Sequence, residues 1–131
     1  MENLKSALIF EKYVVDKIEF IRNDKHFAEE KVNIQFSVAK DVHTLENKMN
    51  VTLAVKVFEN AKENNYPFEM YIQITGFFAI ENDNKQIDFE PNAIAILYPY
   101  IRAIVSTYTA NANVNPLILP PINVNNLFKE N

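Results

Sequence analysis

Residues 49–57 read Met-Asn-Val-Thr-Leu-Ala-Val-Lys-Val, with an apolar side chain at every second position. This period of two is typical of a strand that turns one face to a core. A second alternating run follows in the sequence and ends in four apolar residues after the glycine: Phe68, Met70, Ile72, Ile74, Gly76 and Phe77-Phe78-Ala79-Ile80. The polar segment 60–66, closed by Pro67, is predicted to be the turn between these two strands.

Two more strands are predicted before residue 49. One alternates through Val32, Ile34, Phe36 and Val38, and residues 41–48 are predicted to be a polar link. The first strand covers residues 7–22 and places these side chains on one face: Leu8, Phe10, Val14, Ile18 and Phe20. Its alternation fails at Lys12 and Asp16, which indicates a bulged or edge strand. Successive strands with short polar links favour an antiparallel meander.

The hydrophobic period changes near residue 94. Apolar residues now recur at helical spacing: Ile94, Leu97, Tyr98, Ile101, Ile104, Val105 and Tyr108. Asn92 is a candidate N-cap, and residues 111–116 end the helix. Pro99 fits the first turn of a helix that begins near Tyr98, and otherwise it kinks the helix.

An apolar loop follows the predicted helix. Residues 117–121 read Leu-Ile-Leu-Pro-Pro, too rich in proline for a helix or an internal strand. Asn123 can cap a last short helix over residues 124–129. The predicted fold is therefore α+β: a four-stranded antiparallel meander sheet followed by a long helix, an apolar proline-rich loop and a short C-terminal helix, in one domain of residues 1–131.

Composition removes several classes of function. The net charge of −4 disfavours nucleic acid as a partner. The single glycine, Gly76, leaves no glycine-rich phosphate loop. With no cysteine, and with His26 and His43 in polar links, we expect no metal and no cofactor. No stretch approaches ~18 apolar residues, so we expect no membrane insertion. Residues 1–5 show no secretory signal, which favours a cytoplasmic location. No nucleophile has a base at a recognisable spacing, so we predict that the chain is not an enzyme.

Residues 117–128 read Leu-Ile-Leu-Pro-Pro-Ile-Asn-Val-Asn-Asn-Leu-Phe. This segment is similar to the pattern L-x-L-x-P-V-N-F-x-x-L-F of the SecB family of protein-export chaperones. Residues 91–92 and 96–102 resemble its P-N followed by I-L-F-P-Y-A-R. Residues 76–80 are similar to its G-I-F-x-I strand end, and the order and approximate spacing of the three pieces agree with the family.

The resemblance implies a chaperone that holds unfolded preproteins or other non-native polypeptides in hydrophobic grooves. It also implies a homo-oligomer, a dimer of dimers, and delivery of preproteins to the SecA motor. The implied client-binding residues are Ile18, Phe20, Ile34, Phe36, Phe77, Phe78, Leu117, Leu119, Leu127 and Phe128. Near the family's SecA-docking positions stand Asp16, Glu19 and Tyr71, and Tyr71 replaces an acidic residue. The resemblance therefore implies chaperone activity more directly than SecA binding.

Several alternatives stay open. Residues 117–119 either line a groove or are tucked onto their own domain. Phe77 and Phe78 either contact clients or fill the core and an oligomer contact. The chaperone serves either general export or one partner, such as the antitoxin of a toxin–antitoxin pair. A small hot-dog-type acyl-binding enzyme or carrier is disfavoured, because its central helix lies among the strands, whereas here the helical stripe follows the last strand.

Overall fold

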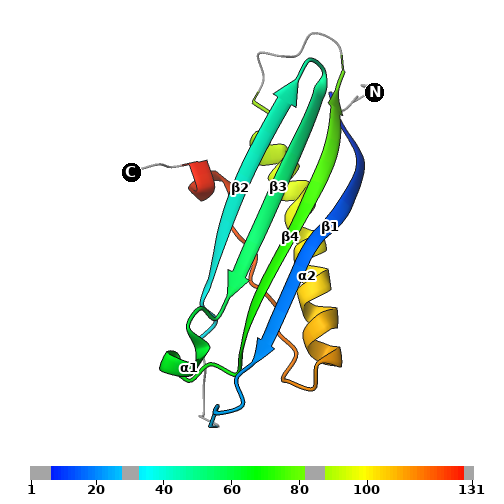
Figure 1. Cartoon of the computed structure of the whole chain (residues 1–131). Helices are drawn as coiled ribbons and strands as arrows, with labels where there is room; N and C mark the ends of the chain where they lie inside the picture. The colour runs from blue at the N-terminus through cyan, green and yellow to red at the C-terminus, as the bar shows by residue number, and fades with distance from the viewer. Residues whose placement is uncertain (1–6, 28–32, 82–87, 129–131) are drawn as a thin grey trace, which may run out of the picture.

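The structure is a computed structural model, and it describes residues 7–27, 33–81 and 88–128. In chain order its elements are β1 (Leu8–Arg22), β2 (Phe36–Leu45), β3 (Lys48–Val57), α1 (Ala61–Asn64), β4 (Phe68–Ile80), α2 (Glu90–Asn111) and the 3-10 helix η1 (Val124–Phe128). The four strands form one antiparallel sheet, and α2 lies along one face of it (Figure 1). The predicted α+β fold is confirmed in its sheet, its long helix and its short C-terminal helix.

The strand order is β1-β4-β3-β2. Strands β2, β3 and β4 follow one another as the predicted meander. Strand β1 departs from a simple meander, because it pairs with β4 and not with β2. The chain therefore passes from one edge of the sheet, at β1, to the opposite edge, at β2.

The predicted polar link over residues 41–48 is wrong in extent. Strand β2 continues to Leu45, and Glu46 and Asn47 alone connect it to β3. Val42 lies opposite Val51 on the core side, while Asp41 and His43 are exposed on the other side of the sheet. Since one face of the sheet meets solvent, polar residues at alternate positions are compatible with a strand.

Strand β1 is a bulged edge strand, as predicted. Its register against β4 shifts between Phe10 and Lys12 and again between Val15 and Lys17. The first shift changes which face the following residues occupy. Val14 pairs with Thr75 on the open face, whereas Tyr13 pairs with Gly76 on the helix face. The prediction for Val14 was therefore wrong, because an extra residue reverses the alternation.

The long helix begins earlier than predicted. Phe89 precedes its first residue, so Asn92 is not the cap. The carboxylate of Asp88 accepts a bond from the backbone N–H of Glu90 at 3.0 Å, which satisfies one free donor of the first turn. Pro99 lies inside the helix and not in its first turn, and it faces solvent, where its ring displaces no core side chain.

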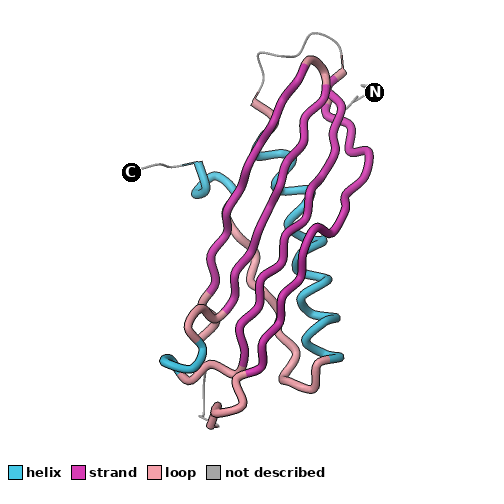
Figure 2. Tube along the Cα trace, viewed as in Figure 1, coloured by secondary structure: helices cyan, strands magenta, loops and turns pink. Residues whose placement is uncertain are grey.

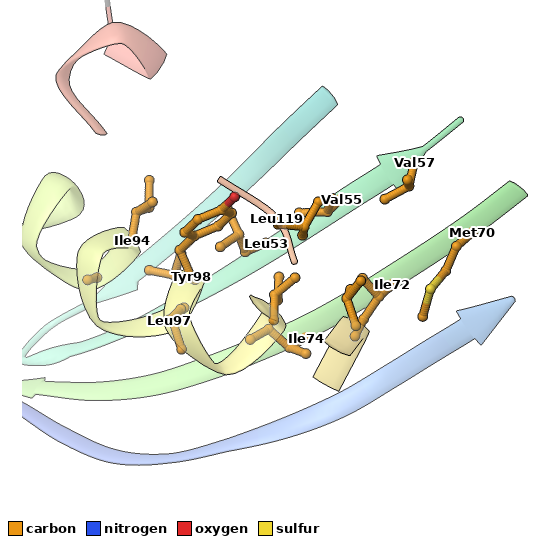
Figure 3. Packing of buried hydrophobic residues seen from close by; sticks show 14 of the residues in the cluster. Leu53, Val55, Val57, Met70, Ile72, Ile74, Ile94, Leu97, Tyr98 and Leu119 are labelled. Atoms are coloured by element: carbon orange, nitrogen blue, oxygen red, sulfur yellow. The ribbon is translucent and has the colours of Figure 1, made fainter. Parts of the chain in front are cut away.

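The core lies between the sheet and α2, as Figure 3 shows for part of it. The alternating side chains of β3 and β4 supply one wall, and the helical stripe supplies the other. Gly76 lets the helix approach, because a Cβ there would lie 2.5 Å from Cδ2 of Leu97. The predicted packing stripe of α2 is confirmed at Ile94, Leu97, Tyr98, Ile101 and Val105, all of them buried.

Residues 112–123, called the strap below, return along the same face of the sheet beside α2 and lead to η1 (Figure 1). The side chain of Asn123 accepts a bond from the N–H of Asn125 at 3.1 Å, which confirms the predicted start of the last helix. In Figure 2 the opposite face of the sheet is covered by no described helix or loop, and it is called the open face below. Within the described ranges, no helix is long and apolar enough to cross a membrane.

Candidate functional site

An apolar groove runs between β1 and α2. Its volume is about 680 Å³. Aromatic side chains form both walls: Tyr13 and Phe20 from β1, and Tyr100 and Tyr108 from α2. The other lining residues come from α2 and its C-terminal end: Ala103, Ile104, Thr107, Asn111 and Ala112. Ring contacts join the two walls, with centroids 4.5 Å apart for Tyr13 and Tyr100 and 5.3 Å apart for Phe20 and Tyr108. We call this feature the β1–α2 groove.

The outer face of α2 borders this groove and carries no charge. Arg102 is the one charged residue between positions 91 and 111, and its Nε donates to the carbonyl oxygen of Leu119 at 2.9 Å. The exposed helix positions are Asn92, Ala95, Pro99, Tyr100, Ala103, Thr107, Tyr108, Ala110 and Asn111. Helix faces in water normally carry charged side chains, so this face has the composition of a surface that is covered.

A second hollow of about 860 Å³, called the basal hollow below, lies at the end of the molecule near α1. Its apolar walls come from the strap and from the ends of the strands: Ile34, Phe58, Pro67, Phe68, Val114, Pro116, Leu117 and Ile118. Its polar lining comes from Arg22, Asn23, Asp24, His26, Asn113 and Asn115. Ile34 and Ile118 have exposed fractions of 40% and 69%.

One buried asparagine holds the floor of the basal hollow in place. The side-chain N–H groups of Asn23 donate to the carbonyl oxygens of Ala61 at 3.2 Å and Tyr66 at 2.9 Å. Its side-chain oxygen accepts from the N–H of Lys25 at 3.0 Å. These bonds tie the end of β1 to α1, so the hollow is supported by a connection between two distant parts of the chain.

Side chains of α2 hold the strap by its backbone. Tyr98 donates to the carbonyl oxygen of Pro120 at 2.6 Å, and Ser106 donates to that of Leu117 at 3.1 Å. The hydroxyl of Thr109 accepts from the N–H of Leu117 at 2.8 Å. Burial of Tyr98 raises the pKa of its hydroxyl, while the charge of Arg102 acts in the opposite direction. The hydroxyl is therefore kept neutral and able to donate.

The strap alternates between buried and exposed side chains. Leu117 and Leu119 lie in the core, and Ile118 between them faces solvent. Of the two alternatives for residues 117–119, packing onto the domain's own core is therefore correct for Leu117 and Leu119. Ile118 remains exposed and available to line a groove. In this arrangement a client can reach Leu117 only at the wall of the basal hollow, and Leu119 has no exposed area.

The other predicted client-binding residues are dispersed. Phe20 lines the β1–α2 groove, and Ile18 lies half-buried on the same strand face. Ile34 lines the basal hollow, and Phe36 is half-buried at the start of β2. Of the aromatic pair, Phe78 is fully buried and Phe77 lies on the open face of the sheet below the ammonium of Lys12. The side chains of Leu127 and Phe128 fall outside the described part of the chain.

The predicted docking residues Asp16, Glu19 and Tyr71 lie on the open face, and all three are engaged within the chain. Thr75 donates to the carboxylate of Asp16 at 2.6 Å, from the strand next to it. Glu19 forms an ion pair with Lys17 at 3.1 Å, and the same ammonium lies 5.7 Å from the ring centroid of Tyr71. Across the described residues, no three His, Cys, Asp or Glu side chains converge as metal ligands would.

Comparison of the sequence with models of known protein families identifies the family of this chain. The sequence model of the family described as Preprotein translocase subunit SecB matches residues 2–131. The chain belongs to the SecB family. Membership supports the predicted chaperone role and agrees with the prediction that the chain is not an enzyme.

Relatives in this family are similar over most of the chain. An uncharacterised protein of Methanocaldococcus jannaschii is 36% identical over 126 residues, which are 92% of this chain and 81% of the relative. A protein of Acidithiobacillus ferrooxidans named protein-export protein SecB is 26% identical over 116 residues, 86% of this chain and 75% of the relative.

Two solved structures share the fold. One is a SecB-like chaperone of Mycobacterium tuberculosis in complex with a ChAD peptide from the HigA1 antitoxin, with a TM-score of 0.67 and 14% identity over 89% of this chain and 91% of that chain. The other is a protein of unknown function from Streptococcus agalactiae, with a TM-score of 0.54 and 12% identity over 87% of this chain and 97% of that chain. At these identities the likeness establishes the fold.

Sequence reasoning missed the aromatic walls of the β1–α2 groove. The spacing of Tyr108 placed it in the packing stripe, although its ring is partly exposed. Tyr13 was not assigned, because the bulge that turns it toward the helix does not follow from the alternation. A signal was present nonetheless, because the helix has hardly any charged residue for its solvent side.

Proposed function

We propose that the protein is a chaperone that holds non-native polypeptide segments on exposed apolar surface, without nucleotide or metal. Membership of the SecB family carries this proposal. The physical support is exposed apolar surface beside a hollow large enough for side chains of a client. Apolar contact is non-directional, so one surface can accept many sequences.

We place the client at the basal hollow. Ile34 and Ile118 supply the exposed apolar contacts on its wall. They come from opposite ends of the sequence, and both chain segments are fixed near the hollow: Gln35 accepts a bond from the N–H of Phe58 at 2.9 Å, and the strap is bonded to α2. Among the predicted client-binding residues, Ile34 and Leu117 fall in this site.

The β1–α2 groove and the outer face of α2 are assigned to self-assembly. The face combines exposed Tyr100 and Tyr108 with small residues such as Ala103, and it lacks charge. Aromatic residues are enriched in protein interfaces and charged residues are depleted from interface cores. Small residues allow close approach of a second copy. We therefore propose a homo-oligomer, in keeping with the dimer of dimers that the family resemblance implies.

Binding to an unfolded probe tests the chaperone role. We expect reduced, carboxymethylated α-lactalbumin to bind with a Kd below about 1 μM, equivalent to about 8 kcal/mol, and the native form not to bind. Ile118→Asp places a charge on the apolar wall, and should weaken binding about tenfold or more, because a charge there must be desolvated. Isothermal titration calorimetry measures both.

Leu45→Asp is the matched control. Leu45 is also exposed, at 77%, but it lies at the β2–β3 hairpin at the far end of the sheet (Figure 1). Its substitution should leave the affinity within about twofold. An equal loss of affinity in both variants would show that the client does not bind at the basal hollow. No binding by the wild-type protein would contradict the chaperone role.

Preprotein export is the setting that we propose, with cytoplasmic preproteins as clients and SecA as the receiving motor. The alternative is a chaperone dedicated to one partner such as an antitoxin. One observation supports this alternative: Asp16 and Glu19 are engaged within the open face, which leaves less free negative charge for docking. Titration of SecA into the protein distinguishes them: micromolar binding supports export, and no binding supports the dedicated partner.

A further inference from the structure

Two asparagines of the strap stand at the basal hollow with their side-chain amides unengaged. Asn113 and Asn115 line the hollow, and both are exposed. Within the described part of the chain, neither amide has a hydrogen-bond partner. Other asparagines nearby are engaged: Asn23 holds the floor of the hollow, and Asn111 donates to the carbonyl oxygen of Thr107 at 2.8 Å. Because an amide has two donor hydrogens and an acceptor oxygen, Asn113 and Asn115 keep their full hydrogen-bonding capacity for a ligand.

The backbone presents these two amides in a fixed arrangement. Asn113 has a φ of 59°, in the left-handed region that asparagine tolerates. Asn115 precedes a proline, whose ring restricts it to extended conformations. The strap is bonded to Thr109 on both sides of the pair: the carbonyl oxygen of Thr109 accepts from the N–H of Ala112 at 3.2 Å, and its hydroxyl accepts from that of Leu117 at 2.8 Å. Little backbone ordering is therefore needed when a ligand binds.

The apolar walls of the hollow leave one need of a client unmet. Ile34 and Ile118 can contact client side chains but form no side-chain hydrogen bonds. A non-native segment that enters the hollow takes its peptide N–H and C=O groups out of water, and each such group weakens binding if it stays unpaired. Every residue except proline carries both groups. A site that bonds to them accepts many sequences.

We propose that the side-chain amides of Asn113 and Asn115 bind the peptide backbone of an extended client segment, while the apolar walls of the basal hollow contact its side chains. The amide oxygen accepts from a client N–H, and the amide nitrogen donates to a client C=O. Backbone is favoured over a charged client side chain because Arg22 and Asp24 line the same hollow with opposite charges and give no preference for one sign. The proposal rests on the proposed chaperone function and names the residues that make binding independent of client sequence.

Asn115→Leu separates hydrogen bonding from apolar contact, because it removes the amide and enlarges the apolar surface. Affinity for reduced, carboxymethylated α-lactalbumin should fall about fivefold, as for the loss of one or two hydrogen bonds. A wall that acts by apolar contact alone would bind as tightly or more tightly. Asn113→Gly removes the other amide, keeps the positive φ and should also weaken binding, by about threefold.

Asn50→Leu is the matched control. Asn50 is exposed on the open face of β3, opposite Phe77 of β4 and away from the basal hollow. The substitution makes the same chemical change, so its affinity should stay within about twofold of the wild type. Isothermal titration calorimetry measures all the affinities, and circular dichroism checks that each variant is folded.

A methylated peptide tests whether the partner is the client backbone. The probe is a nine-residue peptide of alternating leucine and threonine, compared with the same peptide methylated on every backbone nitrogen. Methylation removes the N–H donors, so the wild-type protein should bind the methylated form at least about tenfold more weakly. In the double variant Asn113→Gly, Asn115→Leu the acceptors are already absent, so methylation should cost at least about threefold less there.

The outcomes separate this proposal from the chaperone role. Unchanged affinity of both single variants for unfolded α-lactalbumin overturns the proposal and leaves the chaperone role intact. Equal effects of methylation on the wild type and the double variant assign the amides to client side chains, and also overturn it. Binding of unfolded α-lactalbumin without binding of the peptide does the same, because a site for the backbone should hold any extended segment. If the unfolded protein itself does not bind, the chaperone function is contradicted.

Discussion

Thr109 shows how one buried hydroxyl can fix the course of a loop. It has no exposed area, donates to the carbonyl oxygen of Val105 at 2.8 Å and accepts from the N–H of Leu117 at 2.8 Å. Thr109→Val keeps the shape of the side chain but leaves that N–H without its acceptor. We expect the free energy of unfolding to fall by about 1–3 kcal/mol, as for other buried unsatisfied donors, measured by urea denaturation at one protein concentration.

Thr44→Val is the control for this prediction. Thr44 is exposed near the end of β2, outside both the β1–α2 groove and the basal hollow, and a surface substitution changes stability by less than about 0.5 kcal/mol. Equal stability of the two variants would mean that water or a shifted strap replaces the lost acceptor.

Residue-scale backbone geometry was only partly predictable. The chain has one glycine, and asparagine is the next residue type that readily adopts positive φ, as Asn60, Asn65 and Asn113 do. Glu46 and Phe58 also do so, at 55° and 57°, and nothing in their residue types indicates it. The two-residue hairpin imposes the geometry on Glu46. Ring packing against Tyr66 and Phe68 holds Phe58.

At the scale of elements, the strap and α2 form one unit whose stability should depend on pH. The hydroxyl of Tyr98 donates to Pro120, and burial raises its pKa above the ordinary value of 10.0. The neutral form is therefore favoured by folding. Its stabilisation is fully present below pH 10.0 and is lost as the pH rises through the higher pKa of the folded state.

Tyr98→Phe separates this contribution from that of the other tyrosines. The variant lacks the hydrogen bond, so it should be less stable at about pH 8 by about 0.5–1.5 kcal/mol. Because it also lacks the titrating group, its difference from the wild type should shrink at about pH 11. Urea unfolding at both pH values measures the two differences. A difference that does not change with pH would show that the pKa of Tyr98 is the same in the folded and the unfolded state.

Element boundaries were predictable where apolar residues alternate without interruption. The patterns of β3 and β4 gave correct strands because every second side chain enters the core. The end of β2 was missed because Asp41 and His43 occupy its solvent side, where polarity carries no information about the strand. The phase of β1 between its two register shifts, where Val14 lies, was missed because a bulge is set by pairing with β4, which is not a local property; beyond the second shift Ile18 and Phe20 lie on the predicted face.

At the scale of the whole molecule, the sequence contains a signal for a covered surface, which is the lack of charged residues in α2. A helix of 22 residues with one charged side chain after position 90 cannot keep an ordinary solvated face. The client surface was less predictable. The predicted residues include two that the fold buries completely, Phe78 and Leu119, and alternation alone could not separate a core position from a groove position. The strap-to-helix bonds that bury Leu119 join residues distant in sequence.

The last prediction concerns self-assembly through the uncharged face of α2. We expect the wild-type protein to be a multimer at about 10 μM, because a covered apolar face is stabilising. Ala103→Glu places a carboxylate among Tyr100, Thr107 and the groove wall, where a second copy would have to desolvate it. Assembly should weaken by at least about tenfold, and sedimentation velocity should show a smaller mass than that of the wild-type protein.

Ala39→Glu is the matched change on the open face of β2, where Ala39 is exposed opposite Ala54 of β3. It adds the same charge, so a general effect of net charge on association would appear in both variants. A wild-type protein that sediments as a single chain would contradict self-assembly through α2. Dissociation of Ala39→Glu but not of Ala103→Glu would move the contact to the open face. Dissociation of Ala103→Glu alone would place the interface on α2, because the same charge on the open face leaves the assembly intact.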